Sequence, residues 1–181
     1  MLMGLNLYSV FKEVQVIKQL IYVSRPAKKL SENDIDKILV AARGKNLERR
    51  ITGFLLFDGR MFMQLIEGPP REVDDLFEGL LGDTRHQKVQ KIYDGAATGR
   101  LFSNFSMAFA HLGGEADFDF GGSLSRHDAR QLAQTLRANP TKIRNVIADS
   151  LLDLLGDRED ANHSVFALGQ RDRKKPDQTA A

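Results

Sequence analysis

The stretch ITGFLLFDGRMFMQLIEG, residues 51–68, contains two apolar runs joined by Asp58-Gly59. Short apolar runs rich in β-branched and aromatic residues are typical of buried strands. Asp-Gly between such runs favours a hairpin, because both central residues of a type I′ turn need a positive φ. The sequence therefore predicts a hairpin with strands at 51–57 and 61–67, the second of which ends before Pro69-Pro70.

One strand and one helix are predicted upstream of this hairpin. Residues 16–24 read VIKQLIYVS and are followed by Arg25-Pro26, which predicts a buried strand that ends at the proline. Ser31, with Asp34 three residues later, has the spacing of a capping box, and apolar residues follow at helical spacing. We expect this helix to end near Gly44.

Downstream of the hairpin the same kinds of pattern recur. Residues 72–81 have one apolar face at helical spacing, and residues 89–93 and 105–111 read as strands. The predicted order is β-α-β-β-α-β-β, in which both helices can cover one face of a single sheet. This order favours an α+β fold, a ferredoxin-like sandwich.

The composition changes after Gly113-Gly114. Ser125 is placed to cap one helix, and Asn139-Pro140 reads as the N-cap and first residue of a second helix that ends at Gly156. We expect these two C-terminal helices to pack on the sheet face left open by the others. The predicted divisions are a leader (1–13), a main domain (14–113), a linker (114–123), a helical extension (124–156) and a disordered tail (157–181).

The overall composition excludes several classes of function. The 181 residues include no cysteine, which excludes disulfides, thiolate metal sites, iron–sulfur clusters and cysteine nucleophiles, and we expect no metal. The 26 basic and 24 acidic residues give a net charge of +2, which is too even to favour nucleic-acid binding. No apolar run approaches the ~20 residues of a membrane span, and no signal peptide is evident. We therefore expect a cytoplasmic protein.

Two polar residues occupy positions in the predicted strands that are expected to be buried and apolar. Gln64 lies in a run that is apolar on both faces, and an unpartnered buried amide costs roughly 1–3 kcal/mol, so Gln64 needs a partner. The simplest partner is a backbone group. Tyr22 shares a face with Leu20 and Ser24, and it reads either as a core tyrosine with its tip in water or as a donor of a proton and an electron.

Three further polar residues fall at the ends of the predicted helices. Asn46 follows the first helix, where a cap or turn residue is common. Arg85 and His86 follow the second helix, where basic residues oppose the helix dipole and can pair with Asp83. Together with Tyr22 and Gln64, they place amide, phenol and cationic groups around what would be one slot.

In this order and spacing the chain resembles the BLUF family, blue-light sensors that bind flavin. The resemblance covers about residues 16–112. It rests on the combination of three motifs, because no single one is specific: Ile51-Thr52-Gly53, the strand Phe62-Met63-Gln64-Leu65-Ile66-Glu67-Gly68, and Arg85-His86. The resemblance implies a bound FAD between the two helices and the sheet.

The resemblance also implies a role for individual residues. Tyr22 matches the photoactive tyrosine, Gln64 the switching glutamine, and Asn46 the asparagine that binds the pyrimidine edge of the flavin. Arg85 and His86 match residues near the flavin, and Met107 matches a methionine coupled to signalling. Phe105 stands where the family often has tryptophan, so signal transmission and dark recovery are expected to differ. Lys45 stands where many relatives have a polar neutral residue.

The function implied is light sensing without an output enzyme, with the signal passed to a downstream protein and a homo-oligomer expected. Two other functions stay open. A small flavin-dependent enzyme would need an acid or base near the flavin, for which His86 is the candidate. A flavin-free ferredoxin-like interaction module would have the same fold and no colour.

Overall fold

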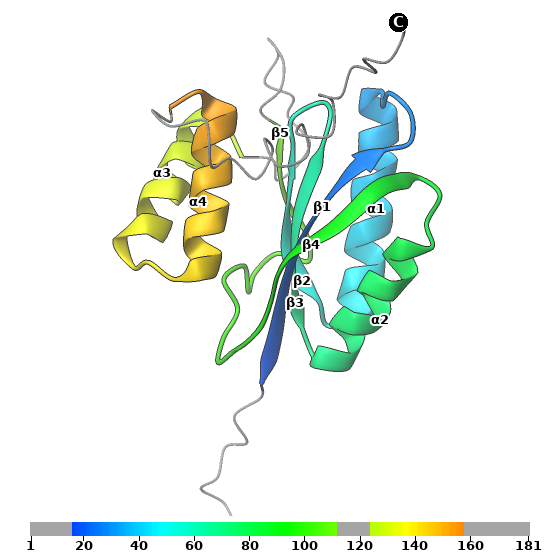
Figure 1. Ribbon diagram of the computed structural model, residues 1–181, viewed down its shortest axis with the longest axis horizontal. Coiled ribbons are helices and arrows are strands. Elements are labelled where there is room, and N and C mark those ends of the chain that lie inside the picture. Colours follow the sequence, from blue (N-terminus) through cyan, green and yellow to red (C-terminus); the bar gives the residue numbers. More distant parts are fainter. Residues whose placement is uncertain (1–15, 112–123, 158–181) are drawn as a thin grey trace, which may run out of the picture.

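The computed structural model describes residues 16–111 and 124–157 (Figure 1). The leader (1–13), the linker (114–123) and all but the first residue of the tail (157–181) predicted from the sequence lie outside the described residues. The strands are β1 Ile17–Pro26, β2 Thr52–Phe57, β3 Phe62–Gly68, β4 His86–Ala97 and β5 Ala108–His111. The helices are α1 Glu32–Glu48, α2 Pro70–Leu81, α3 Arg126–Ala138 and α4 Lys142–Leu155.

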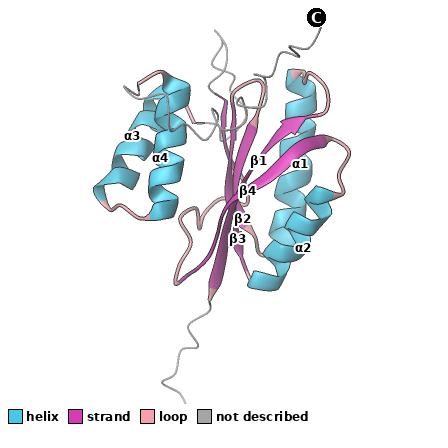
Figure 2. Ribbon diagram, viewed as in Figure 1, coloured by secondary structure: helices cyan, strands magenta, loops and turns pink. Residues whose placement is uncertain are grey.

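The described strands form one five-stranded sheet in the order β4-β1-β3-β2-β5. All neighbouring pairs are antiparallel except β2 and β5, which are parallel. Helices α1 and α2 cover one face, and α3 and α4 cover the other, so the fold has three layers (Figures 1 and 2). The α+β, ferredoxin-like prediction with two C-terminal helices on the open face is confirmed.

Strand β3 is buried on both faces, as its two-sided apolar pattern predicts. Met63 and Leu65 pack with the α3/α4 layer, and Phe62 and Ile66 face the α1/α2 layer.

The capping boxes at Ser31 and Ser125 are both present, and each serine side chain accepts from the backbone three residues later. Within the described ranges, no helix combines the length and apolar composition needed to cross a membrane.

Helix α1 is longer than predicted. It passes through Gly44 and ends after Glu48, where Arg50 takes the left-handed conformation at φ 54°. Arg50 N–H donates to Leu47 O at 3.1 Å, and Ile51 N–H donates to Asn46 O at 2.8 Å, which is a Schellman ending. The prediction that Asn46 follows the helix is therefore wrong. The helix ends later, because Arg50 adopts the left-handed conformation that a glycine usually provides at a helix C-terminus.

The hairpin turn also differs from the prediction. Gly59 has φ 85°, but Asp58 has a negative φ, so the type I′ prediction is wrong. Asp58 N–H donates to Met61 O at 3.3 Å, so Gly59 and Arg60 are the central residues of the turn, and of these two only Gly59 has a positive φ. The Asp58 carboxylate accepts from Arg60 N at 2.7 Å and Met61 N at 2.5 Å, which stabilises this turn.

Other element ends also differ from the prediction: β4 extends beyond the predicted 89–93 at both ends, and α2 begins at Pro70 rather than at residue 72. Strand β5 begins at Ala108 rather than Phe105, because Phe105 turns back and its N–H donates to Phe102 O at 3.2 Å. Helix α4 has Thr141 as its N-cap rather than Asn139, since the Thr141 hydroxyl accepts from Arg144 N at 3.3 Å.

Candidate functional site

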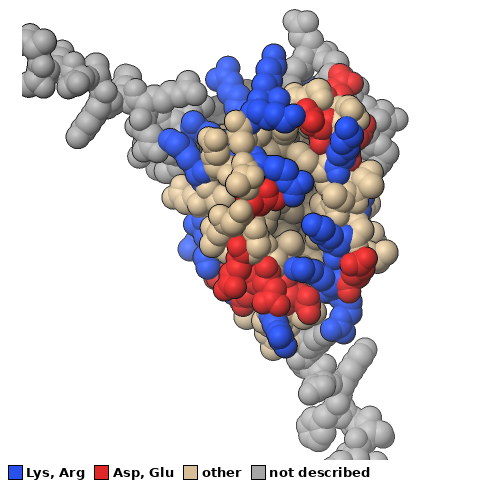
Figure 3. All heavy atoms as spheres, turned by 90° about the vertical axis from the view of Figure 1, so that its right-hand side faces the viewer, with Lys and Arg blue, Asp and Glu red and all other residues tan. Residues whose placement is uncertain are grey.

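A cavity of about 680 Å³ lies between α1, α2 and the sheet. Figure 3 looks onto this side of the molecule and shows a hollow with basic side chains around it. Apolar side chains from all three walls line the cavity, among them Ile38 of α1, Leu55 of β2 and Leu76 of α2. A cavity of this size with mainly apolar walls and a few polar groups is typical of cofactor sites.

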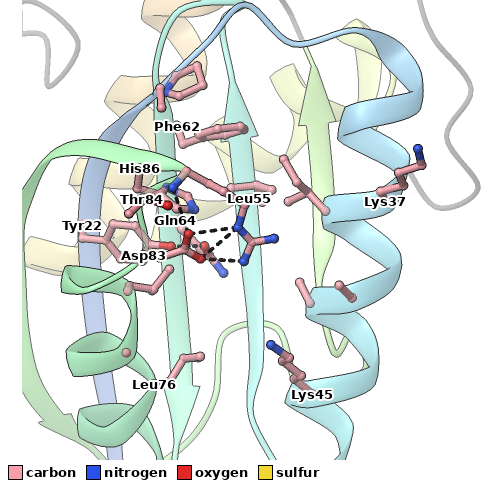
Figure 4. Close-up of a pocket in the computed structure, with 18 of the residues that line it drawn as sticks. Tyr22, Lys37, Lys45, Leu55, Phe62, Gln64, Leu76, Asp83, Thr84 and His86 are labelled. Atoms are coloured by element: carbon pink, nitrogen blue, oxygen red, sulfur yellow. Dashed lines mark hydrogen bonds and ion pairs between the residues drawn. The ribbon is translucent and has the colours of Figure 1, made fainter.

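Tyr22 and Gln64 lie side by side on the floor of the cavity (Figure 4). They face each other across the β1–β3 pair, because the antiparallel register puts Tyr22 opposite Gln64. The Tyr22 hydroxyl donates a hydrogen bond to Gln64 Oε1. The two side chains are 0% and 9% exposed, so this bond is buried.

The surroundings of Tyr22 keep its phenol protonated. Phe77 of α2 packs against its ring, with the ring centroids 5.8 Å apart. Burial raises the pKa of Tyr22 well above its usual range, and the negative charge of Asp83 raises it further. The phenol is therefore a hydrogen-bond donor throughout the neutral range.

This raised pKa predicts a loss of stability at high pH. The unfolded phenol ionises at about pH 10, whereas the folded one keeps its proton. The unfolded state then binds fewer protons, so the free energy of unfolding falls as the pH rises above about 10. Urea unfolding between about pH 8 and pH 11 should show a steeper fall for the wild type than for Tyr22→Phe. Equal slopes would contradict this assignment.

The amide of Gln64 has a second partner on its other side. Gln64 Nε2 donates to Met107 Sδ at 3.6 Å. Met107 is 2% exposed and lies just before β5, beside β2. The sequence alone favoured a backbone partner for Gln64, but both partners are side chains. A thioether is a weak acceptor, so the bond to Tyr22 is the stronger of the two.

Asn46 reaches the cavity from the last turn of α1. It is 2% exposed, and its Nδ2 donates to Ser106 O at 2.8 Å. On the same helix, Arg43 Nε donates to Met107 O at 3.2 Å. Two side chains of α1 therefore fix the backbone that precedes β5, and one of them also lines the cavity.

Arg85 and His86 lie at the mouth of the cavity beside Asp83. Arg85 forms a two-pronged ion pair with Asp83, with Nε–Oδ1 at 2.9 Å and Nη2–Oδ2 at 2.5 Å. Hydrogen bonds from Arg85 lower the pKa of Asp83 to about 2. Burial lowers the pKa of His86, whose Nδ1 lies 3.0 Å from Ser24 Oγ. The pair predicted with Asp83 is present.

The structure thus brings five of the seven predicted residues to one cavity, and Met107 touches one of them, Gln64, directly. Phe105 is the exception. Its side chain is 50% exposed and does not line the cavity. Its backbone is nevertheless held, because Gly53 N–H donates to Phe105 O at 3.2 Å.

Sequence reasoning missed the cationic rim of the cavity. Four side chains of this kind line it in addition to Arg85: Lys28, Lys37, Lys45 and Arg49. Three of them belong to α1 or its C-cap: Lys37, Lys45 eight residues later, and Arg49 four residues after that. Ile38 and Ala42, which belong to the apolar residues at helical spacing in this helix, line the cavity together with these cations. The spacing of Lys37, Lys45 and Arg49 along the predicted helix was the signal in the sequence that could have indicated this cationic rim.

Comparison with known proteins agrees with this geometry. The sequence profile of the BLUF family, described as sensors of blue-light using FAD, matches residues 17–108. The dark-state structure of BlrB, a BLUF protein, is 29% identical with a TM-score of 0.55, and the match covers 80% of this chain and 99% of that one. A bacterial light-regulated adenylyl cyclase is 28% identical with a TM-score of 0.54, over 67% of this chain and 34% of the other.

Two curated relatives are much longer than the matched region. A photoactivated adenylate cyclase subunit alpha-like protein from Euglena gracilis is 32% identical over 53% of this chain and 10% of its own length. The blue light- and temperature-regulated antirepressor BluF of Escherichia coli K12 is 31% identical over 43% of this chain and 19% of its own length. The similarity therefore concerns only a small part of each relative.

Proposed function

Because the chain belongs to the BLUF family, the sensors of blue light using FAD, we propose that it is a cytoplasmic photoreceptor with non-covalently bound FAD. In this proposal, blue light rearranges the hydrogen bonds of Tyr22 and Gln64, and the change is passed to a partner protein. The BLUF module is a sensor rather than a catalyst, so we propose no enzymatic activity. The observation that carries the proposal is the buried hydrogen bond from Tyr22 to Gln64 in the cavity.

The residues around the cavity fit a flavin. The cavity volume of about 680 Å³ lies within the usual range for cofactor pockets. Ile38, Leu55 and Leu76 offer apolar surface to a planar ring. The amides of Asn46 and Gln64 supply the mixed donors and acceptors that a pyrimidine edge requires. The cations at the rim suit the phosphates of FAD, since Lys and Arg are the usual phosphate partners.

Tyr22, Asn46 and Gln64 would hold the flavin ring, with Arg85 and His86 near the ring and its side chain. When bound and excited by blue light, the flavin supplies a strong oxidant at this position. Tyr22 is placed to respond, because its hydroxyl proton already points at Gln64 Oε1. Burial of the phenol disfavours free tyrosinate, so its proton and electron are expected to leave and return together.

Gln64 provides the two-state element that a switch needs. In the described orientation its oxygen accepts from Tyr22 and its nitrogen donates to Met107. Rotation or tautomerisation of the amide would exchange donor and acceptor between these two partners. The altered hydrogen bond to a flavin carbonyl would shift the absorption to the red. Two arrangements that differ in hydrogen bonds are the minimum for a population shift.

We propose that the signal leaves through Met107 and the neighbouring Phe105. Met107 contacts Gln64, and the exposed Phe105 side chain lies two residues away on the surface. The receiver is a separate, unidentified protein or another copy of this chain, in keeping with the homo-oligomer expected from the sequence. Cyclase activity is a property of the longer relatives, and we do not extend it to this chain.

Two measurements on the purified protein separate this function from its two alternatives. Purified protein supplied with FAD should turn yellow, and its absorption should shift to the red after a blue flash and recover in the dark. A protein that stays colourless would favour the flavin-free interaction module. Turnover of a reduced nicotinamide in darkness would favour a flavin-dependent enzyme with His86 near the flavin.

A further inference from the structure

A row of three polar side chains crosses the sheet on the face opposite to the cavity. Gln19 of β1 and Thr52 of β2 both pair in register with Glu67 of β3. Glu67 is 0% exposed and Gln19 is 3% exposed. The rest of this face is the apolar core beneath α3 and α4. A fully buried carboxylate at its margin is costly unless several donors surround it.

Glu67 has four such donors. Gln19 Nε2 donates to Oε2 at 2.7 Å, and Thr52 Oγ1 donates to Oε1 at 3.4 Å. The other two are backbone groups of the loop between β4 and β5: Leu101 N–H donates to Oε2 at 2.7 Å and Phe102 N–H to Oε1 at 2.9 Å. Only an ionised carboxylate accepts at both oxygens without presenting a donor of its own.

The Arg100 guanidinium also binds this loop to the neighbouring strands. Its Nη1 donates to Thr52 Oγ1 at 2.9 Å and to Glu67 O at 2.6 Å, and its Nη2 donates to Arg50 O at 2.6 Å. The Phe102 ring stacks on Phe54 with centroids 5.0 Å apart. Residues 100–102 are therefore fixed by charge, by backbone hydrogen bonds and by ring packing.

The loop then carries the chain from this face to the cavity face. Phe102 belongs to the core under α3 and α4, whereas Met107 belongs to the core under α1. Glu67 holds the loop at its start, and Gln64 meets its end through Met107. Gln64 and Glu67 are three residues apart on β3 and on opposite faces, so one strand holds both ends of one loop.

We propose that Glu67 is a positioning residue for the photoreaction: it anchors residues 100–107 so that Met107 stays against the amide of Gln64, and thereby sets the lifetime of the lit state. The inference rests on the proposed function and deepens it. Release of the anchor loosens Met107 and lowers the barrier for Gln64 to return to its dark orientation.

The test is Glu67→Gln, which keeps the shape of the side chain but replaces one acceptor oxygen with a donor. The variant should bind FAD and show the red shift, and its dark recovery should be at least about threefold faster, within the range that indirect coupling produces. In the flavin-free protein, the Leu101 and Phe102 amide hydrogens should exchange faster with solvent, because one of them loses its acceptor. Gln19→Met, which removes the donor to Glu67 Oε2 and to Gly99 O, should act in the same direction if Glu67→Gln does not fold.

Ile147→Val is the matched control, since Ile147 lies in the core of the same face and its aliphatic side chain takes no part in the hydrogen bonds of Glu67 and Arg100. It should lower stability and leave recovery unchanged, which separates positioning from general destabilisation. Unchanged or slower recovery in Glu67→Gln, with a normal photocycle in the wild type, would overturn this inference alone. A wild type without a red shift would overturn the proposed function, and this inference with it.

Discussion

Tyr22→Phe should leave the protein folded and yellow and eliminate the light-induced red shift. The substitution removes only the hydroxyl, so the ring contact with Phe77 is kept. It also removes the donor to Gln64 Oε1 and the source of a transferable proton. Without that proton, the amide has no route to its second arrangement. Absorption spectra before and after a blue flash give the measurement, with loss of essentially the whole shift expected.

Two companion variants sharpen this result. Gln64→Leu removes the partner of both Tyr22 and Met107 and should also abolish the shift while FAD stays bound. Tyr93→Phe is the same chemical change on β4, where the ring packs with the opposite core, and it should leave the photocycle intact. A normal shift in Tyr22→Phe or in Gln64→Leu would show that the mechanism is wrong at that residue.

Gly53→Ala is expected to be the most damaging small change to the fold. A β-carbon at this position would overlap the carbonyl oxygen of Leu65, because β2 and β3 approach closely there. Backbone must then move in two central strands, and the cost is expected to reach about 3 kcal/mol of unfolding free energy. Urea unfolding measures it. This close approach gives the Ile51-Thr52-Gly53 motif a physical reason.

Gly44→Ala provides the control for that substitution. Gly44 lies within α1, and a β-carbon there would meet nothing within 4 Å. Alanine is the better helix former, so this variant should gain about 0.5–1 kcal/mol. Equal losses of stability in both variants would contradict the steric argument for Gly53.

The sequence predicted those features that depend on neighbours in the chain. The hairpin strands, the capping box at Ser31 and the cap at Ser125 all follow from local period and spacing. The end of α1 could not be predicted in this way, since Arg50 adopts a conformation usually reserved for glycine. The Glu67 network was also beyond reach, because its donors at Gln19 and Leu101 come from opposite ends of the domain.

The outward position of Phe105 could not be predicted from the sequence either. Its apolar side chain and alternating neighbours predicted a strand, but a backbone hydrogen bond to Phe102 turns the chain before β5 begins. The structure places Tyr22, Asn46, Gln64, Arg85 and His86 around one cavity, and their roles in light sensing belong to the proposed function. Residue type and spacing located the pocket, and only the folded chain gave the partners of each polar atom.

Strands β1 and β3 both lie in the interior of the sheet, bonded to a neighbour along each edge. A slip of one residue between them would turn Tyr22 toward the opposite layer and break two ladders together. We therefore expect the backbone under Tyr22 and Gln64 to be among the parts of the fold that open most rarely. In the proposed mechanism, a change at this pair therefore leaves through side chains toward the β5 edge of the sheet, such as Met107, rather than through a shift of the two central strands.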